Sequence, residues 1–283
     1  MIPRIRKRVA GICGLFTLAV IAYITGAAGF VRRTLALPDR DQIAQQWIHR
    51  GSTVALRDSG RRLVFLITGQ SNAGNYGRGI RRRSESRVYN AYHGRLYRAR
   101  DPLLGSDGLG ISPWIPFAET LLQRGAAQSV VLALAVRGGM GVREWNQGGS
   151  MRTELFARVA DLRALGLAPD YVLWQQGESD AFPFHTTPED YARSVRDLVE
   201  SVRQAGISAP VLIVQATRNL YAGPSGPIRD AQARLVDPAR GMLRGPDTDR
   251  LGPEFRYDGV HFSEAGITAL SQMWVAAILN SSR

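Results

Sequence analysis

Short, continuous apolar runs alternate along the chain with longer segments in which apolar residues recur every three or four positions. The run at residues 63–67 (LVFLI) is typical of a strand that is buried on both faces of a parallel sheet. Similar runs lie at residues 129–136, 171–174 and 211–215, with a weaker one at 87–92. Helical spacing is found at residues 155–165, 191–202 and 265–279. This alternation predicts an α/β fold with a parallel sheet covered on both faces.

A longer apolar run lies near the N-terminus. The 23 residues from Val9 to Val31 carry no charge and are bracketed by basic residues. About 20 apolar residues span the hydrocarbon core of a bilayer, whereas the apolar part of a secretory signal has about 7–15. We therefore expect an uncleaved anchor, although residues 25–28 (TGAA) would also fit a cleavage site. Four bases precede the run and two follow it, which favours a cytoplasmic N-terminus and a domain outside the cytoplasmic membrane.

These patterns divide the chain into three parts. We expect a membrane anchor (or an uncleaved signal) at residues 1–33, a polar connector at residues 34–60 with a helix near 39–49, and one α/β domain at residues 61–283. The single cysteine, Cys13, lies in the apolar run, so the domain has no disulfide. The sequence thus predicts a single-pass protein of the cytoplasmic membrane whose membrane contact is made by residues 9–31.

The basic charge of the chain changes this picture little. The net charge is +12, but the first 33 residues contain six bases and no acid, so half of the excess is local to the N-terminus. Nucleic-acid binding needs a clustered basic face with interleaved aromatic side chains. The tightest cluster, at residues 78–87, lacks that interleaving. We expect no nucleic-acid partner, and no metal site either, because no His, Cys and carboxylate cluster has ligand spacing.

The strand at residues 63–67 ends abruptly in small and polar residues, at 68–74 (TGQSNAG). Ligands bind just beyond the carboxyl ends of strands in open α/β sheets, so Ser71 lies where a nucleophile is expected. The alternative is that Ser71 or Asn72 merely caps a helix. Three further polar stretches follow later strands or precede the last helix, at residues 137–141 (RGGMG), 175–180 (QQGESD) and 258–261 (DGVH).

Together these stretches contain the groups that nucleophilic catalysis needs. A serine hydroxyl reacts only when a neighbouring base takes its proton, and His261 can be that base while Asp258 holds its imidazole in the required tautomer. A tetrahedral intermediate also needs preorganised N–H donors for its oxyanion. The candidate donors are the backbone N–H groups of Ser71 and of either Gly138 or Gly139, and the side chain of Gln176.

Four sequence blocks resemble those of a known family. They are residues 69–72 (GQSN), Gly138-Gly139 with Trp145, residues 174–180 (WQQGESD) and the pair Asp258 and His261. Over residues 63–265 the chain resembles the SGNH-type hydrolases, and more narrowly the sialate O-acetylesterases and acetylxylan esterases of carbohydrate esterase family six. The resemblance implies a three-layer α/β/α sandwich with a central parallel sheet and no metal or organic cofactor.

The resemblance also assigns roles to individual residues. It implies Ser71 as nucleophile, His261 as base and Asp258 as the partner of that base. It places an oxyanion donor in the Gly138-Gly139 pair and another at Gln176. Supporting residues would be Gln70, Asn72 and Glu178, with Glu178 a buried hydrogen-bonding residue behind the nucleophile loop. The chain departs from the family pattern at Ala73-Gly74 and at Met140, positions that bear on the substrate rather than on the chemistry.

The other histidines suit the base less well. His49 precedes the predicted domain, and His93 lies in an arginine-rich stretch. His185 follows the strand that precedes Gln176 and is a candidate substrate contact. The aromatic residues Trp114, Trp145 and Tyr221 could stack on a sugar, but core packing is their commoner fate.

The resulting hypothesis is a serine esterase that removes O-acetyl groups from a carbohydrate outside the cytoplasmic membrane through an acyl-enzyme on Ser71. Its partner is an acetylated carbohydrate substrate. One alternative is an envelope-glycan O-acetyltransferase that uses the same site, and another is a non-catalytic glycan-binding module. Hydrolysis of lipid esters or thioesters is the nearest enzymatic rival.

Overall fold

The computed structural model of the protein describes residues 40–56, 60–219 and 223–281. A compact unit comprises Gln45–Arg283. The predicted anchor at residues 9–31 lies outside the described residues, so it stays a prediction. Within the described ranges, no helix combines the length and the apolar character needed to cross a membrane.

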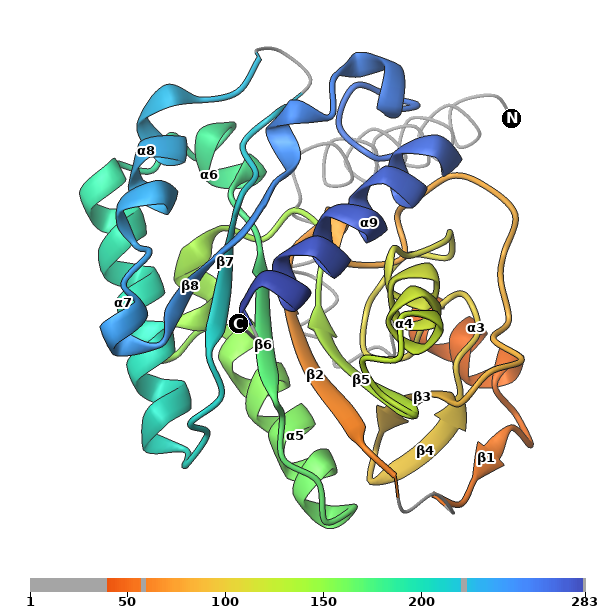
Figure 1. The fold of residues 1–283 in the computed structure, drawn as a ribbon. Helices are drawn as coiled ribbons and strands as arrows, with labels where there is room; N and C mark the ends of the chain where they lie inside the picture. Colours follow the sequence, from red (N-terminus) through yellow and green to blue (C-terminus); the bar gives the residue numbers. More distant parts are fainter. Residues whose placement is uncertain (1–39, 57–59, 220–222, 282–283) are drawn as a thin grey trace, which may run out of the picture. The chain divides into compact units, whose positions relative to one another are not determined.

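The fold is built on a single sheet (Figure 1). Its eight strands lie in the order β1 (Thr53–Val54), β4 (Arg95–Arg98), β3 (Val88–Tyr92), β5 (Ser129–Val136), β2 (Arg62–Gly69), β6 (Tyr171–Gln175), β7 (Val211–Gln215) and β8 (Met242–Asp247). All neighbours from β3 to β8 pair in parallel. Strand β4 runs antiparallel to both β3 and β1, so the sheet is mixed and the expectation of a parallel sheet is wrong at this edge.

A tight turn explains the antiparallel edge. Strands β3 and β4 are joined by His93 and Gly94, whose φ angles of 48° and 66° are both positive. Two consecutive positive φ angles form the turn that closes a two-residue β-hairpin, and such a short loop can join only antiparallel strands. Asp161 fixes the turn, since its carboxylate accepts hydrogen bonds of 2.9 Å from the backbone N–H groups of both residues.

Helices cover both faces of the sheet. One face packs against α5 (Ser150–Ala164), α7 (Pro188–Gln204) and α8 (Gly226–Arg234), and the other packs against α4 (Trp114–Gln123) and α9 (Glu264–Ser281). The expected helices at 155–165, 191–202 and 265–279 are therefore confirmed, as are the expected strands. The helix expected near residues 39–49 is α3 (Arg40–Ile48), and one further short helix is α6 (Glu178–Ala181). Single 3-10 turns lie at η1 (Ser71–Ala73), η2 (Val142–Trp145), η3 (Pro238–Arg240), η4 (Thr248–Arg250) and η5 (Pro253–Phe255).

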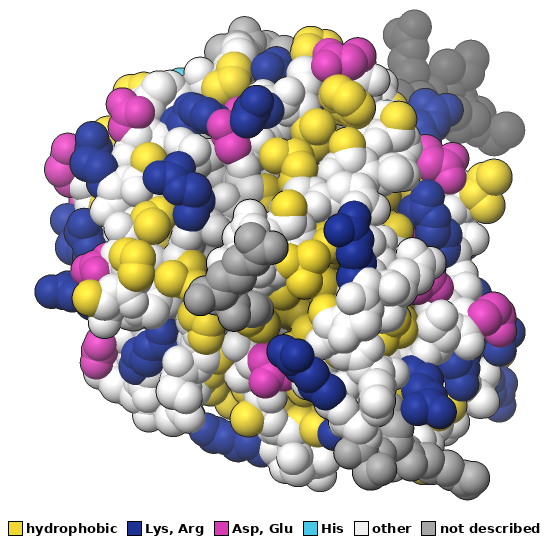
Figure 2. Space-filling view, viewed as in Figure 1, with side chains coloured by type: hydrophobic (Ala, Val, Ile, Leu, Met, Phe, Trp, Pro, Cys, Tyr) yellow, Lys and Arg dark blue, Asp and Glu magenta, His cyan; other side chains and the backbone are white. Residues whose placement is uncertain are grey.

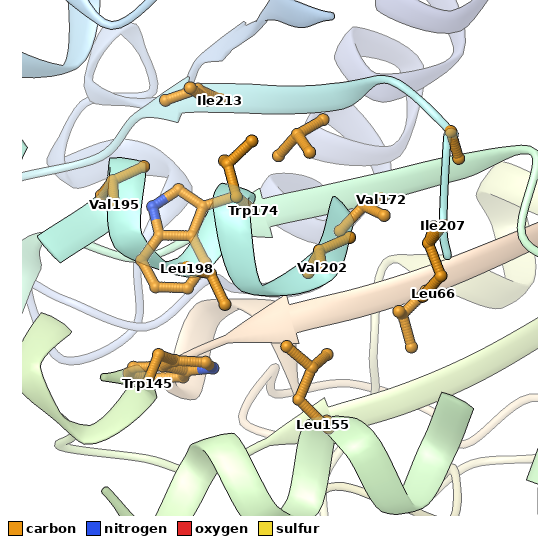
Figure 3. Close-up of a cluster of buried hydrophobic side chains, with 14 of the residues drawn as sticks. Leu66, Trp145, Leu155, Val172, Trp174, Val195, Leu198, Val202, Ile207 and Ile213 are labelled. Carbon is orange, nitrogen blue, oxygen red and sulfur yellow. The ribbon is translucent and has the colours of Figure 1, made fainter. Parts of the chain in front are cut away.

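Strand β2 shows why its sequence is apolar without alternation. Successive side chains of a strand point to opposite faces, and both faces are covered here. Val64 and Leu66 join the cluster under α5 and α7, whereas Phe65 and Ile67 join the cluster under α4 and α9. Figure 3 shows Leu66 in the first cluster, among side chains of the neighbouring strand and helices.

The register of the central strands decides where the polar stretches meet. Gly69 at the end of β2 is paired with Val136 on β5 and with Gln175 on β6. The residues that follow each strand therefore emerge side by side at one edge of the sheet, which is where ligands bind in open α/β folds.

Charged side chains are dispersed over the visible face of the molecule. Figure 2 shows Arg side chains interleaved with Asp and Glu over this face.

Candidate active site

The loop that carries Ser71 begins with a glycine that no other residue can replace. Gly69 has a φ of +147°, and a Cβ atom there would lie 2.0 Å from the Gln175 carbonyl oxygen. This close approach lets the Gln70 N–H donate to that same carbonyl oxygen at 3.1 Å. The chain then turns into η1, so Ser71 lies directly beyond the carboxyl end of β2 and is 4% exposed.

Asn72 connects the Ser71 loop to two distant segments. Its side-chain Nδ2 donates to Glu178 Oε1 at 2.7 Å and to the Val260 carbonyl oxygen at 3.3 Å. Its own carbonyl oxygen accepts from Gln175 Nε2 at 2.8 Å. Val260 directly precedes His261. The contact between Asn72 and Val260 therefore brings the loop of the predicted nucleophile next to the loop of the predicted base.

Indole groups complete the support of this loop. Trp274 on α9 donates from Nε1 to Gln175 Oε1 at 2.9 Å, and Trp114 on α4 donates to the Ala73 carbonyl oxygen at 2.6 Å. Below the loop, Trp145 donates to Thr68 Oγ1 at 2.7 Å. Buried indole N–H groups need such acceptors, so these hydrogen bonds connect tryptophans of the core to the Ser71 loop and to the ends of the adjoining strands.

Gln70 joins the Ser71 loop to the start of α6. Its Oε1 accepts hydrogen bonds from Gln176 Nε2 at 3.1 Å and from the backbone N–H of Ser179, also at 3.1 Å. Gln70, which the sequence analysis names as a supporting residue, is thus a buried bridge between two of the sequence blocks.

Glu178 is fully buried behind the loop. Burial raises the pKa of Glu178 to about 7, and the hydrogen bond from Asn72 opposes that rise. The carboxyl group faces Asn72. The resemblance implies a buried hydrogen-bonding residue at this position, and Glu178 is 4% exposed and accepts from Asn72; its supporting role stays a prediction.

Asp258 and His261 form a hydrogen-bonded pair at the surface. His261 Nδ1 lies 2.6 Å from Asp258 Oδ2, and Asp258 Oδ1 accepts from the backbone N–H groups of Val260 at 2.9 Å and His261 at 2.7 Å. Burial tends to raise the pKa of Asp258, but these hydrogen bonds outweigh it and hold the pKa below its ordinary value. With Nδ1 facing the carboxylate, the His261 Nε2 atom is the one available to a serine hydroxyl.

No hydrogen bond joins Ser71 Oγ to His261 in the part of the chain that the structure describes. The two residues lie on adjoining loops, as the contact between Asn72 and Val260 shows. Catalytic hydrogen bonds are often long before substrate binds and tighten in the complex.

The Gly138-Gly139 pair presents two different N–H groups. The Gly138 N–H donates to the Asp107 carboxylate, at 3.0 Å to Oδ1 and 3.2 Å to Oδ2. Gly139 is exposed, has a φ of +70°, and its N–H has no acceptor among the described residues. The sequence analysis leaves open which glycine serves the oxyanion, and here only the Gly139 N–H is unoccupied.

Gln176 is held by three acceptors. Its Nε2 is 3.1 Å from Gln70 Oε1 and 3.1 Å from the Met140 carbonyl oxygen, and it also donates to Asp180 Oδ2. Three acceptors around one amide nitrogen fix the orientation of the amide. Its expected role as an oxyanion donor stays a prediction, since donation to a substrate would require one of these contacts to be exchanged.

Three residues that the sequence analysis does not single out also shape the site. The ring of Tyr76 stacks on His261, with centroids 5.2 Å apart and planes 22° apart, and its hydroxyl donates to Asp107 Oδ2 at 2.8 Å. The buried Arg256 donates to the carbonyl oxygens of Val260 and, at 3.0 Å, of Thr248, which fixes the loop of Asp258 and His261. No local motif marks Tyr76 or Asp107, because their partners are remote in sequence, and Arg256 contacts backbone carbonyl oxygens, which carry no sequence signal.

The remaining candidates lie elsewhere. His49 is buried, with Nε2 2.9 Å from the Pro102 carbonyl oxygen, and Trp114 and Trp145 are core residues. Tyr221 lies outside the described residues. His185 lines a cavity of about 370 Å³. Within residues 40–56, 60–219 and 223–281, no group of three or more His, Cys, Asp or Glu side chains could hold a metal ion.

The sequence of the chain matches the model of a known family. The model of the carbohydrate esterases described as sialic acid-specific acetylesterases matches residues 61–280. The chain belongs to this family. It is therefore a member of a class of hydrolases that act on ester bonds, as the resemblance of its sequence blocks indicates.

A curated relative agrees with this assignment. A probable carbohydrate esterase of Arabidopsis thaliana is 30% identical to this family member over 129 residues, which cover 44% of the chain and 49% of that protein. The match thus spans about half the length of the curated relative.

Solved structures share the fold. A protein from Arabidopsis thaliana has a TM-score of 0.63 at 22% identity, covering 78% of this chain and 98% of its own. NanS has a TM-score of 0.56 at 17% identity, with coverages of 81% and 99%. A lipase/acylhydrolase from Enterococcus faecalis has a TM-score of 0.51 at 14% identity, with coverages of 77% and 96%. At these identities the similarity shows the fold.

Proposed function

We propose that this protein is a serine O-acetylesterase that removes acetyl groups from a carbohydrate outside the cytoplasmic membrane, through an acyl-enzyme on Ser71. Membership of a carbohydrate esterase family supports the ester substrate. The observation that carries the serine mechanism is the pair formed by Asp258 and His261 beside the Ser71 loop, joined to it through Asn72 and Val260.

In the first half of the reaction, Ser71 Oγ attacks the ester carbonyl carbon while its proton moves to His261 Nε2. The Asp258 carboxylate stabilises the imidazolium that forms. The negative charge that develops on the carbonyl oxygen is bound by the N–H groups of Ser71 and Gly139. Neither N–H has an acceptor among the described residues, and the loss of one such donor typically costs about 2.7–4 kcal/mol of barrier.

The carbon–oxygen bond to the sugar then breaks, and the sugar oxygen takes the proton from His261. In the second half, a water molecule attacks the acetyl-serine carbonyl and gives its proton to His261, which returns a proton to Ser71 Oγ as acetate leaves. The His261 side chain is 22% exposed, so the water molecule that this step needs can reach it.

The proposed location rests on the sequence. The uncharged run at residues 9–31 and its flanking bases support a single-pass anchor with the catalytic domain outside. A reporter enzyme that is active only outside the cytoplasm, fused after residue 283, tests this orientation. Reporter activity is expected. Its absence in an expressed fusion would overturn the proposed location, but it would not bear on the proposed esterase reaction.

The chemistry is tested with p-nitrophenyl esters of increasing chain length, using the detergent-purified full chain and its Ser71→Ala variant. We expect turnover that favours the acetate ester and that disappears in the variant. Intact turnover in Ser71→Ala would overturn the assignment of the nucleophile. A preference for long acyl chains would indicate a lipase or thioesterase, and acetyl transfer to an added glycan in place of acetate release would indicate a transferase.

A further inference from the structure

A cavity of about 370 Å³ adjoins the candidate active site. It lies between the segment that follows the Gly138-Gly139 pair and the segment that follows α6, and Gly141, Asp180, Phe184 and His185 are among its lining residues. Of these, Asp180 also accepts a hydrogen bond from Gln176, and His185 is the histidine that the sequence suggests as a substrate contact.

Hydrogen bonds connect this cavity to the nucleophile loop. Gln176 Nε2 contacts both Gln70, the neighbour of Ser71, and Asp180, whose side chain lines the cavity. Asp180 Oδ2 also accepts from the Val142 N–H at 2.9 Å, so the cavity wall is fixed to the oxyanion segment. A ligand in the cavity would therefore be bound next to the groups that carry out the chemistry.

The cavity combines an apolar ring with polar groups. Phe184 lines the cavity and is 54% exposed, so a ligand in the cavity can contact its ring. Its ring packs against Gly141, where a Cβ atom would lie 2.9 Å from Phe184 Cδ2. An exposed ring face surrounded by hydrogen-bonding groups suits a sugar, whose C–H face is apolar and whose hydroxyl groups are polar.

His185 adds a second observation. Its φ of 48° is in the left-handed region that a residue with a side chain rarely adopts. Such conformations persist where the surrounding structure enforces them, and they cluster at ligand sites. Here the next residue, Thr186, is fixed by Asp180: the Asp180 carboxylate accepts from Thr186 Oγ1 at 2.6 Å, and the Asp180 carbonyl oxygen accepts from the Thr186 N–H at 2.9 Å.

The charges around the cavity favour a neutral sugar. Acidic side chains of the lining are Glu144, Asp180 and Asp190, and the cation among them is Arg143. Arg143 is paired with Asp190 at 3.2 Å, and Asp190 also pairs with Arg193 outside the lining. The carboxylate of an acidic sugar would meet more acidic than basic groups here and would have to compete with Asp190 for Arg143.

We propose that this cavity binds a neutral sugar unit of the acetylated substrate, with its apolar face against Phe184, and that it selects against acidic sugars such as sialic acid. This inference rests on the proposed esterase function and names its substrate class. It differs from what the description of the family alone would indicate.

The test compares ester substrates with and without a sugar. The substrates are p-nitrophenyl acetate, acetylated xylotetraose, methyl 6-O-acetyl-β-D-glucoside and 9-O-acetyl-N-acetylneuraminic acid. We expect the wild-type chain to hydrolyse at least one neutral sugar ester with a higher kcat/KM than the sialic acid ester. A higher kcat/KM for the sialic acid ester, or turnover of p-nitrophenyl acetate without turnover of either neutral ester, would overturn the proposal.

A pair of matched variants tests the role of the ring. In Phe184→Ala we expect the KM for the neutral sugar ester to rise about 3- to 10-fold, while kcat/KM for p-nitrophenyl acetate stays within about twofold. The control is Trp47→Ala, which removes another exposed aromatic side chain, one that does not line the cavity. An unchanged KM in Phe184→Ala, or an equal loss on both substrates, would overturn the proposal.

A third variant tests selection by charge. In Asp190→Asn, Arg143 loses its acidic partner, and we expect kcat/KM for the sialic acid ester to rise about threefold or more relative to the neutral ester. A ratio that stays constant would overturn the charge argument.

Direct binding separates this inference from the proposed function. Methyl β-D-glucoside, xylotetraose and N-acetylneuraminic acid are titrated into the inactive Ser71→Ala chain by calorimetry. Binding of a neutral sugar that Phe184→Ala weakens would support the cavity even if no ester is hydrolysed. If the wild-type chain hydrolyses none of the esters, the proposed function is overturned. If the Ser71→Ala chain binds no neutral sugar, the assignment of the cavity is overturned.

Discussion

The two halves of the candidate active site are held in opposite ways. On the serine side, Gln70, Ser71 and Asn72 are 3–4% exposed and are bonded to buried groups from β6 and α6. On the histidine side, the side chains of Asp258 and His261 are 36% and 22% exposed. Asp258 accepts hydrogen bonds from Val260 and His261, which lie two and three positions further along the chain.

This difference assigns a separate physical task to each half. The interior of the protein fixes the proposed nucleophile, whose position must be preorganised. The proposed base is fixed by a local carboxylate and by the stacked ring of Tyr76, and it is open to the water that the second half of the proposed reaction needs. Substitutions on the serine side should therefore lower stability, and substitutions on the histidine side should lower activity alone.

The largest effect is expected for His261→Ala. The loss of a general base should lower kcat for p-nitrophenyl acetate by about 10²- to 10⁴-fold. Because the side chain is partly exposed and its removal leaves no buried group unpaired, the free energy of unfolding should change by no more than about 0.5 kcal/mol. Steady-state kinetics and urea denaturation measure the two quantities. A large loss of stability would contradict the division between the halves.

The next effect is expected for Glu178→Ala. It removes the 2.7 Å hydrogen bond of the buried Asn72 amide, so the free energy of unfolding should fall by about 1–3 kcal/mol. Glu178→Gln keeps an acceptor oxygen for Asn72 and is the matched control, with a smaller expected loss. Urea denaturation of both variants measures this, and equal losses would show that the hydrogen bond does not hold the loop.

The pH dependence of stability tests the burial of Glu178. Its pKa is about 7 in the folded protein against an ordinary value of 4.5, so the folded state binds the proton more tightly than the unfolded chain. Its contribution to stability is fully present below about pH 4.5 and is lost as the pH rises through about 7. Denaturation between pH 4 and 8 should show this loss in the wild-type chain relative to Glu178→Gln. Parallel curves for the two proteins would contradict it.

The smallest effect is expected for Tyr76→Phe. This variant keeps the ring on His261 and removes the 2.8 Å hydrogen bond to Asp107. One hydrogen bond contributes about 0.5–1.5 kcal/mol, so kcat/KM should fall by about 2- to 10-fold. Tyr76→Ala also removes the stacked ring and should in addition shift the pH profile of kcat/KM. An identical pH profile in Tyr76→Ala would reduce Tyr76 to a structural role.

Sequence reasoning located the parts of the site that have local signals. Ser71 follows a strand whose continuous apolar run predicts burial on both faces. The register of β2 with β5 and β6 then places the polar stretches that follow these three strands side by side. Asp258 and His261 are three positions apart, so their pairing is a local feature that spacing alone can indicate. The helices at 155–165, 191–202 and 265–279 have clear periodicity and were likewise predictable.

Long-range contacts could not be predicted in the same way. The occupation of the Gly138 N–H by Asp107 depends on the packing of two loops 31 positions apart. The two-residue strand β1 joins the sheet edge from within residues 34–60, where polar composition predicted a connector. The antiparallel strand β4 (RLYR) places basic residues at both of its ends and lies in no apolar run, and its partner β3 carries only a weak signal.

The indole contacts around the Ser71 loop have a spectroscopic consequence. Trp114, Trp145 and Trp274 are buried and donate to Ala73, Thr68 and Gln175, all within the loop that carries Ser71 or directly next to it. Indole emission depends on hydrogen bonding and on solvent exposure, so a displacement of this loop changes the intrinsic fluorescence of the protein. The architecture thus contains its own optical reporter, and a change in tryptophan emission on mixing with substrate is a label-free signal for the acylation of Ser71 that we propose.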